Sequence, residues 1–110
     1  MATLRRTKMV AASPTFDIIT RVVADYYRVP PAAITRSGHP KVDHRLPRNV
    51  ARYLALRFEG VSMSMVGYYF GHAGAVIANQ SRRRVEIEKV LRPTFATELE
   101  TLEATIRAQL

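Results

Sequence analysis

Residues 62–81 read SMSMVGYYFGHAGAVIANQS, and this stretch decides the fold that we expect. A short apolar segment follows Ser62, a residue type that caps helix N-termini, and it stops at Gly71. A second helical pattern runs over 74–91. Two helices joined by a short Gly-containing turn form the helix-turn-helix pattern, in which the second helix enters the major groove of DNA. The stretch therefore predicts this motif, with its turn at 70–74.

The rest of the chain also shows helical periodicity. Apolar side chains recur at spacings of three and four over 14–28, and a short helix is expected over 31–34. Another helix should begin at Pro47 and end near Glu59, before a glycine. In the helix over 74–91 the expected core anchors are Val76, Ile77, Val85 and either Val90 or Leu91. These patterns predict an all-α fold, a compact bundle of about six helices.

The C-terminal segment carries the most regular apolar stripe, with neighbours three or four residues apart. The stripe consists of Phe95, Leu99, Leu102, Ile106 and Leu110. Such a face needs a partner, so 94–110 should either pack on the helix over 14–28 or form a homodimer. The expected domains are a mobile basic arm at 1–13, a helix-turn-helix domain at 14–93 and this amphipathic helix at 94–110.

The charge of the chain points to a polyanionic partner. Seventeen Lys and Arg against nine Asp and Glu give a net charge of +8. The chain has no cysteine, and its histidines, His39, His44 and His72, have no metal-ligand spacing, so neither a disulfide nor a metal site is expected. No signal peptide, membrane span or nucleotide-binding loop is recognisable, and the scattered acids do not suggest an enzyme. We expect a cytoplasmic, nucleoid-associated protein without cofactors.

The expected DNA contacts fall into two groups. Phosphates should be bound by exposed cations and by polar groups at helix starts, because these neutralise the backbone. This group contains Arg36, Lys41, Arg45, Arg48, Ser62, Arg82 and Arg83. Bases should be contacted by small residues at the start of the second helix and by amides that can pair with adenine. This group contains His72, Ala73, Gly74, Ala75, Asn79 and Gln80.

Residues 18–88 resemble the C-terminal DNA-binding domain of the bacterial replication initiator DnaA. Residues 22–27, VVADYY, are similar to a motif of that family's first helix, and 46–51, LPRNVA, to the start of a later one. Residues 60–71 resemble the Ser-Leu-x-x-Ile-Gly-x-x-Phe-Gly stretch of the same domain. The resemblance implies a Trp-repressor-like fold, a phosphate contact at Arg48, and a role in replication control or transcription regulation.

The resemblance departs from the family where base recognition is most specific. The family signature Gly-Gly-Arg-Asp-His-Thr-Thr-Val is replaced by a shorter segment, GHAGAV, at 71–76. The base-reading Asp, His and Thr are missing, so recognition of the usual DnaA site is not expected to carry over. The alternative hypothesis is a protein-binding module that uses the Met- and Tyr-rich helix near Met63 and the amphipathic helix over 94–110.

Overall fold

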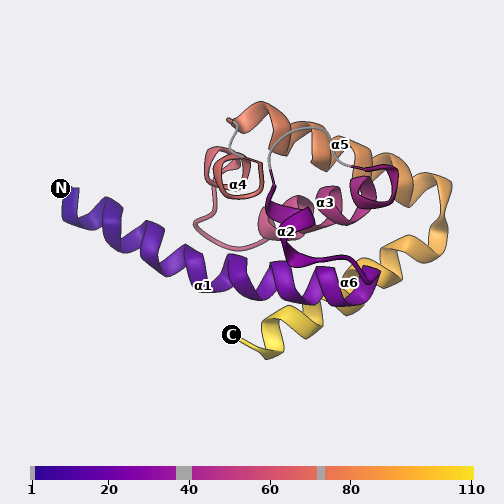
Figure 1. The fold of residues 1–110 in the computed structure, drawn as a ribbon, viewed down its shortest axis with the longest axis horizontal. Coiled ribbons are helices and arrows are strands. Elements are labelled where there is room, and N and C mark those ends of the chain that lie inside the picture. Colours follow the sequence, from indigo (N-terminus) through magenta and orange to yellow (C-terminus); the bar gives the residue numbers. More distant parts are fainter. Residues whose placement is uncertain (1, 37–40, 72–73) are drawn as a thin grey trace.

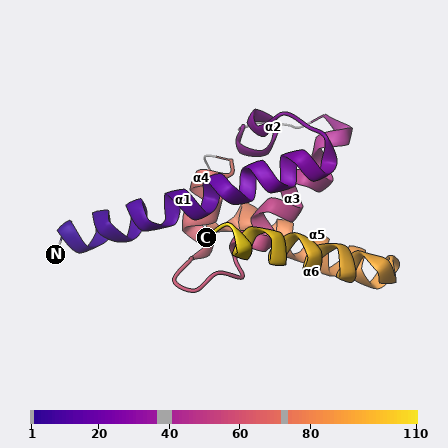
Figure 2. The ribbon, with the colours of Figure 1, turned by 90° about the horizontal axis from the view of Figure 1, so that it is seen from below.

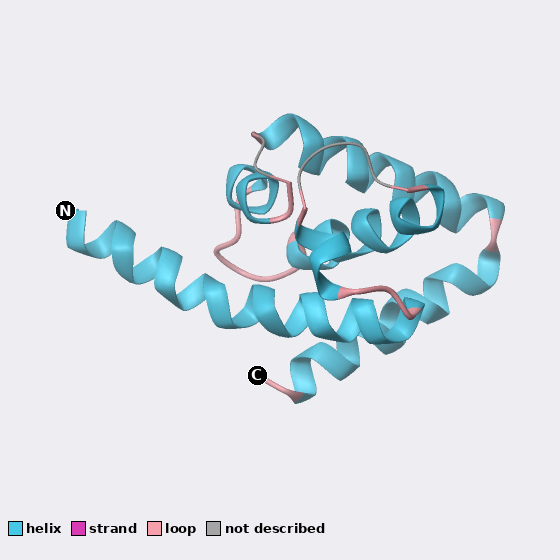
Figure 3. Ribbon diagram, viewed as in Figure 1, coloured by secondary structure: helices cyan, strands magenta, loops and turns pink. Residues whose placement is uncertain are grey.

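A computed structural model describes the backbone of residues 2–36, 41–71 and 74–110, and side chains from residue 14 onward within these ranges. The described chain is all-α, with six helices and no strand (Figure 3). The helices are α1 (Ala2–Tyr27), α2 (Pro31–Thr35), α3 (Val42–Ala55), α4 (Met63–Tyr69), α5 (Ala75–Leu91) and α6 (Pro93–Ala108). The predicted six-helix, all-α bundle is therefore confirmed.

Helix α1 is longer than the sequence predicted. We expected it to begin at Ser13–Pro14, but it begins at Ala2 and contains Pro14. An interior proline costs a helix one hydrogen bond, which is why it suggested a start. Figures 1 and 2 show the N-terminal half of α1 leading away from the other helices. The structure describes only the helical backbone of 2–13, so the assignment of 1–13 as a mobile basic arm stays a prediction.

The end of α1 has the geometry of a left-handed helix cap. Arg28 has a φ of 57°, and the N–H of Val29 donates to the carbonyl of Ala24 at 3.0 Å. This bond satisfies a carbonyl that the helix end would leave unpaired. The chain then turns into Pro30 and Pro31, which start α2 as predicted.

Helix α3 also begins before the expected proline. The predicted start at Pro47 is wrong, because the helix begins at Val42 and runs through that proline to Ala55. Most of α3 is buried, and it packs against α1, α2 and α5. It is the central element on which the other helices are arranged (Figure 1).

The amphipathic stripe of α6 is covered within the chain. Phe95, Leu99, Leu102 and Ile106 are buried, and α6 packs against α1, α5 and α3. Only Leu110, at the end of the predicted stripe, is exposed. Helix α6 therefore closes the core, and the predicted homodimer loses the apolar face that was expected to drive it.

Helix α5 buries small residues where large ones were expected. Val76, Val90 and Leu91 are exposed, which makes their predicted role as core anchors wrong, whereas Val85 is buried as predicted. The buried face instead contains Ala78, Ser81 and Val85 at spacings of three and four. Small side chains at such positions let two helix backbones approach closely, and here α5 lies against α3 and α4.

Candidate nucleic-acid interface

Helices α4 and α5 are joined by a short turn. Helix α4 begins after Ser62, whose Oγ accepts a hydrogen bond from the Met65 N–H at 3.2 Å, as its predicted capping role requires. The helix ends at its C-cap, Phe70, and α5 begins after Gly74, which has an extended backbone. His72 and Ala73, two of the predicted base contacts, lie outside the described residues. Gly74 and Ala75 lie at the start of α5, as expected.

One side of α5 is directed away from the core. Consecutive residues of a helix are about 100° apart around its axis. A second set of residues therefore lies on the side of α5 opposite the buried Ala78, Ser81 and Val85. We call the members of this set that lie in the first three turns of α5 its outer face; they are Val76, Asn79, Gln80 and Arg83. Val76 is 72% exposed, and Gln80 and Arg83 are exposed too. Asn79 is half-buried.

The outer face of α5 combines groups that complement base edges in the major groove. A valine can contact a thymine methyl group, Asn and Gln amides can pair with adenine, and Arg can pair with guanine or a phosphate. Nη2 of Arg82 donates to Oδ1 of Asn79 at 2.8 Å and so orients that amide. Gln80 has no such neighbour among the interactions described, and its longer side chain extends from an exposed position.

The other predicted phosphate contacts are placed on two parts of the bundle. Arg82 and Arg83 are exposed on α5, whereas Arg36 is exposed at the C-cap of α2 and Lys41 and Arg45 are exposed at the start of α3. Helices α3 and α5 pack directly against each other. Ser62 is exposed and its hydroxyl hydrogen is free to be donated, because its oxygen is the acceptor in the cap.

Arg48 differs from the other cations in that it is only 4% exposed. We expected it at the start of a helix, but it lies in the second turn of α3, where Nε and Nη2 donate to the carbonyl of Ala33 at 3.1 and 3.0 Å. These bonds attach α2 to α3. Burial, with a smaller effect of the nearby Arg36, lowers the pKa of the Arg48 guanidinium. The predicted phosphate contact at Arg48 would therefore require the side chain to leave this position.

A second buried arginine was missed by the sequence analysis. Arg52 is 4% exposed, and its Nε and Nη2 donate to the carbonyl of Phe70 at 3.0 and 2.6 Å. Its Nη1 donates to Oγ of Ser81 at 3.1 Å, and that hydroxyl donates to Oδ1 of Asn49 at 2.9 Å. Burial first, and the charge of Arg48 second, lower the pKa of Arg52 to about 10. One side chain of α3 thus holds the end of α4 and the second turn of α5.

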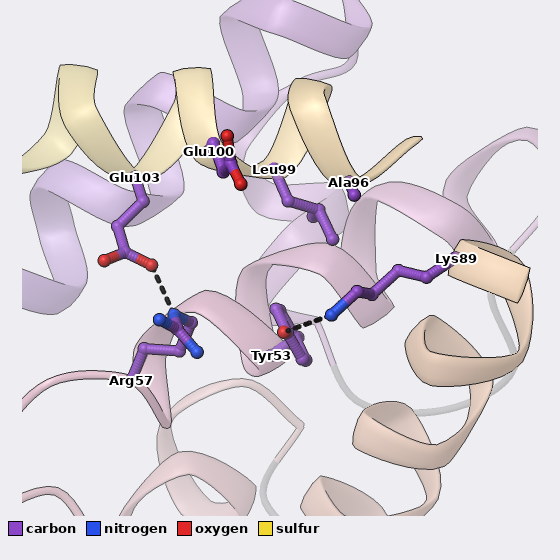
Figure 4. A pocket seen from close by; sticks show the side chains of 7 residues that line it. All are labelled: Tyr53, Arg57, Lys89, Ala96, Leu99, Glu100 and Glu103. Atoms are coloured by element: carbon purple, nitrogen blue, oxygen red, sulfur yellow. Dashed lines mark hydrogen bonds and ion pairs between the residues drawn. The ribbon is translucent and has the colours of Figure 1, made fainter. Parts of the chain in front are cut away.

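A cavity with charged walls lies between α3, α5 and α6 (Figure 4). Its volume is about 120 Å³, below the roughly 300 Å³ at which small-molecule sites begin. Its cations already have partners: Arg57 contacts Glu103, and Nζ of Lys89 lies 3.7 Å from Oε2 of Glu86 and 3.5 Å from the Tyr53 hydroxyl. Because the cavity is small and its charged side chains already have partners, the outer face of α5 is the better candidate for a binding site.

Neither a metal site nor a membrane-spanning helix is found in the described residues. They contain no group of His, Cys, Asp or Glu that could hold a metal ion. No helix in the described ranges has the combination of length and apolar composition that crossing a bilayer requires.

No family model and no characterised protein matches this sequence. The resemblance of 18–88 to the DnaA domain therefore stays a prediction that depends on its motifs alone. The arrangement of the chain's own residues is what bears on function.

Proposed function

We propose that this protein binds duplex DNA, with α4 and α5 acting as a helix-turn-helix and the outer face of α5 lying in the major groove. The observation that carries the proposal is the exposed combination of Val76, Gln80 and Arg83 along one side of α5, directly after a short turn. In helix-turn-helix proteins the residues that contact bases lie in the N-terminal part of the second helix. These three residues lie in the first three turns of α5.

The charge of the chain supports the same partner. Its net charge is +8, and exposed cations lie on α5 and at the start of α3. Phosphate contacts by such side chains supply most of the non-specific affinity of DNA-binding proteins. The base-facing groups would then add preference for particular sequences, because only they meet the base edges.

The biological role proposed with this activity is control of replication or of transcription at the nucleoid, without catalysis. It follows from the resemblance to the DnaA domain and from the lack of a nucleotide-binding loop in the sequence. A chain of this kind would act by occupying its site on DNA.

The protein-binding alternative is less favoured by the arrangement of its two surfaces. Met63 and Met65 are half-buried and pack against the core, so α4 does not present a methionine-rich face. The stripe of α6 is buried inside the same chain. Tyr68 is the one exposed aromatic of α4 that this alternative could still use.

A matched pair of arginine variants tests the proposal. Arg83→Ala removes a charge from the outer face of α5, whereas Arg21→Ala removes the same charge from an exposed position of α1, which packs on α2, α3 and α6. We expect Arg83→Ala to weaken duplex binding and to lower the slope of log affinity against log salt by about 1. Arg21→Ala should leave both nearly unchanged. Equal effects of the two variants would place the DNA elsewhere and contradict the proposal.

A further inference from the structure

Arg52 connects the three helices that would form and support the DNA-contacting unit. Its guanidinium donates to the carbonyl of Phe70, the C-cap of α4. This carbonyl lies at the helix end, where no hydrogen bond within the helix can satisfy it. Its remaining Nη1 reaches Ser81 on the buried face of α5. A guanidinium presents its donors in a rigid planar fork, so these bonds fix the end of α4 and the second turn of α5 relative to α3.

Gly71 is the position that makes room for this guanidinium. A Cβ atom at Gly71 would lie 2.9 Å from Nη2 of Arg52, closer than real Cβ atoms come to other atoms. Nη2 cannot move away cheaply, because it is buried and bonded to the Phe70 carbonyl at 2.6 Å. The buried position of the Arg52 guanidinium therefore requires a glycine at position 71, the first residue of the turn.

The cost of this arrangement indicates that it serves more than stability. In the part of the chain that the structure describes, Arg52 has no ion-pair partner, and a second buried cation, Arg48, lies one turn away. Burying an uncompensated charge is unfavourable, and apolar residues of similar volume often replace buried charges without loss of stability. An apolar residue could not, however, make the hydrogen bonds to Phe70 and Ser81.

We propose that Arg52 is a positioning residue for DNA recognition: together with Gly71 it sets the angle at which α5 leaves the turn, without touching DNA itself. This inference depends on the proposed function for its consequence, while the pairing of Arg52 with Gly71 stands on the contacts alone. A recognition helix displaced by about 1 Å still presents its charges to phosphate but misaligns its hydrogen bonds to bases.

The first test measures the pairing without DNA. Gly71→Ala should lower the ratio of folded to unfolded protein about tenfold in the wild-type chain, because the added methyl group overpacks the site. In an Arg52→Met background, where a flexible side chain replaces the fork, the same change should cost less than about threefold. If Arg52→Met does not fold, Arg52→Lys takes its place in the same urea denaturation series. An equal effect of Gly71→Ala in both backgrounds would overturn the pairing.

The second test measures DNA recognition under conditions where each variant is fully folded by circular dichroism. Arg52→Met and Arg52→Lys should reduce the preference for a selected duplex over a scrambled one about tenfold, with non-specific binding changed less than about twofold. Arg57→Met, which removes an exposed arginine from the turn that follows α3, is the matched control and should keep the preference.

The outcomes separate the two proposals. A wild-type chain that binds no duplex DNA would contradict the proposed function, whatever the denaturation series shows. Wild-type binding with full preference retained in folded Arg52→Met would overturn the positioning role, because a merely stabilising residue leaves a folded variant unchanged.

Discussion

Replacing Phe95 by alanine tests whether α6 belongs to the core. The Phe95 ring is fully buried at the start of α6, and the guanidinium of Arg92 lies 4.7 Å from its centroid. Truncating a buried phenylalanine to alanine costs about 3–5 kcal/mol of unfolding free energy, because it removes transfer energy and leaves a cavity. A chain of this length has a total stability of roughly 5–15 kcal/mol, so the variant should lose a large share of it.

Urea denaturation followed by circular dichroism gives the measurement. With a slope of about 2 kcal/mol per molar urea, the midpoint of Phe95→Ala should fall by roughly 2 M. Thr94→Ala, at an exposed neighbouring position, is the control and should stay within about 0.5 kcal/mol of the wild type. A loss below about 1 kcal/mol for Phe95→Ala would refute the docking of α6, and self-association of the wild-type chain in sedimentation would then support the homodimer.

Two further predictions concern α1 and its contact with α4. Burial, and then the hydrogen bond from the Tyr69 hydroxyl to Asp17, raise the pKa of Tyr69 from its ordinary 10.0 to about 12. The stability contributed by this phenol is present below about pH 10 and lost as pH rises through about 12, so Tyr69→Phe should flatten the alkaline stability profile and remove one late-titrating tyrosine from the ultraviolet absorbance titration. Arg28 has a φ of 57°, so Arg28→Gly should raise the unfolding free energy by about 1 kcal/mol; a decrease in the thermal midpoint would contradict this reason.

The number and order of helices followed from the sequence because periodicity and capping residues are local signals. The stripe at Phe95, Leu99 and Leu102 predicted α6, and Ser62 predicted the start of α4. The helix starts predicted from prolines were wrong, because prolines are common at the first position of a helix, whereas Pro14 and Pro47 lie inside α1 and α3. Both helices continue across the proline despite the loss of one hydrogen bond, and no local pattern in the sequence indicates this.

The exposed residues of the candidate site could be predicted from the sequence, but the buried residues that support them could not. Exposed polar residues such as Gln80 and Arg83 can be recognised from composition and helical spacing. The roles of Arg48 and Arg52 could not be recognised, because an arginine on a helix is exposed in most proteins. Here the two guanidinium groups bind carbonyls that are 15 and 18 residues away in the sequence. One signal was present: Arg52 lies within the otherwise apolar run 50–55, which is long enough to lie in the core.

The most direct test of the central claim is selection of bound fragments from random duplex DNA, carried out in parallel with the wild-type chain and with Gln80→Ala. The side chain of Gln80 lies on the outer face of α5, where a lost base contact should affect one base pair and cost about 1–3 kcal/mol. We predict that the wild type enriches a defined sequence and that Gln80→Ala relaxes the preference at a single position within it. No enrichment by the wild type, or an identical preference in both chains, would contradict recognition through α5.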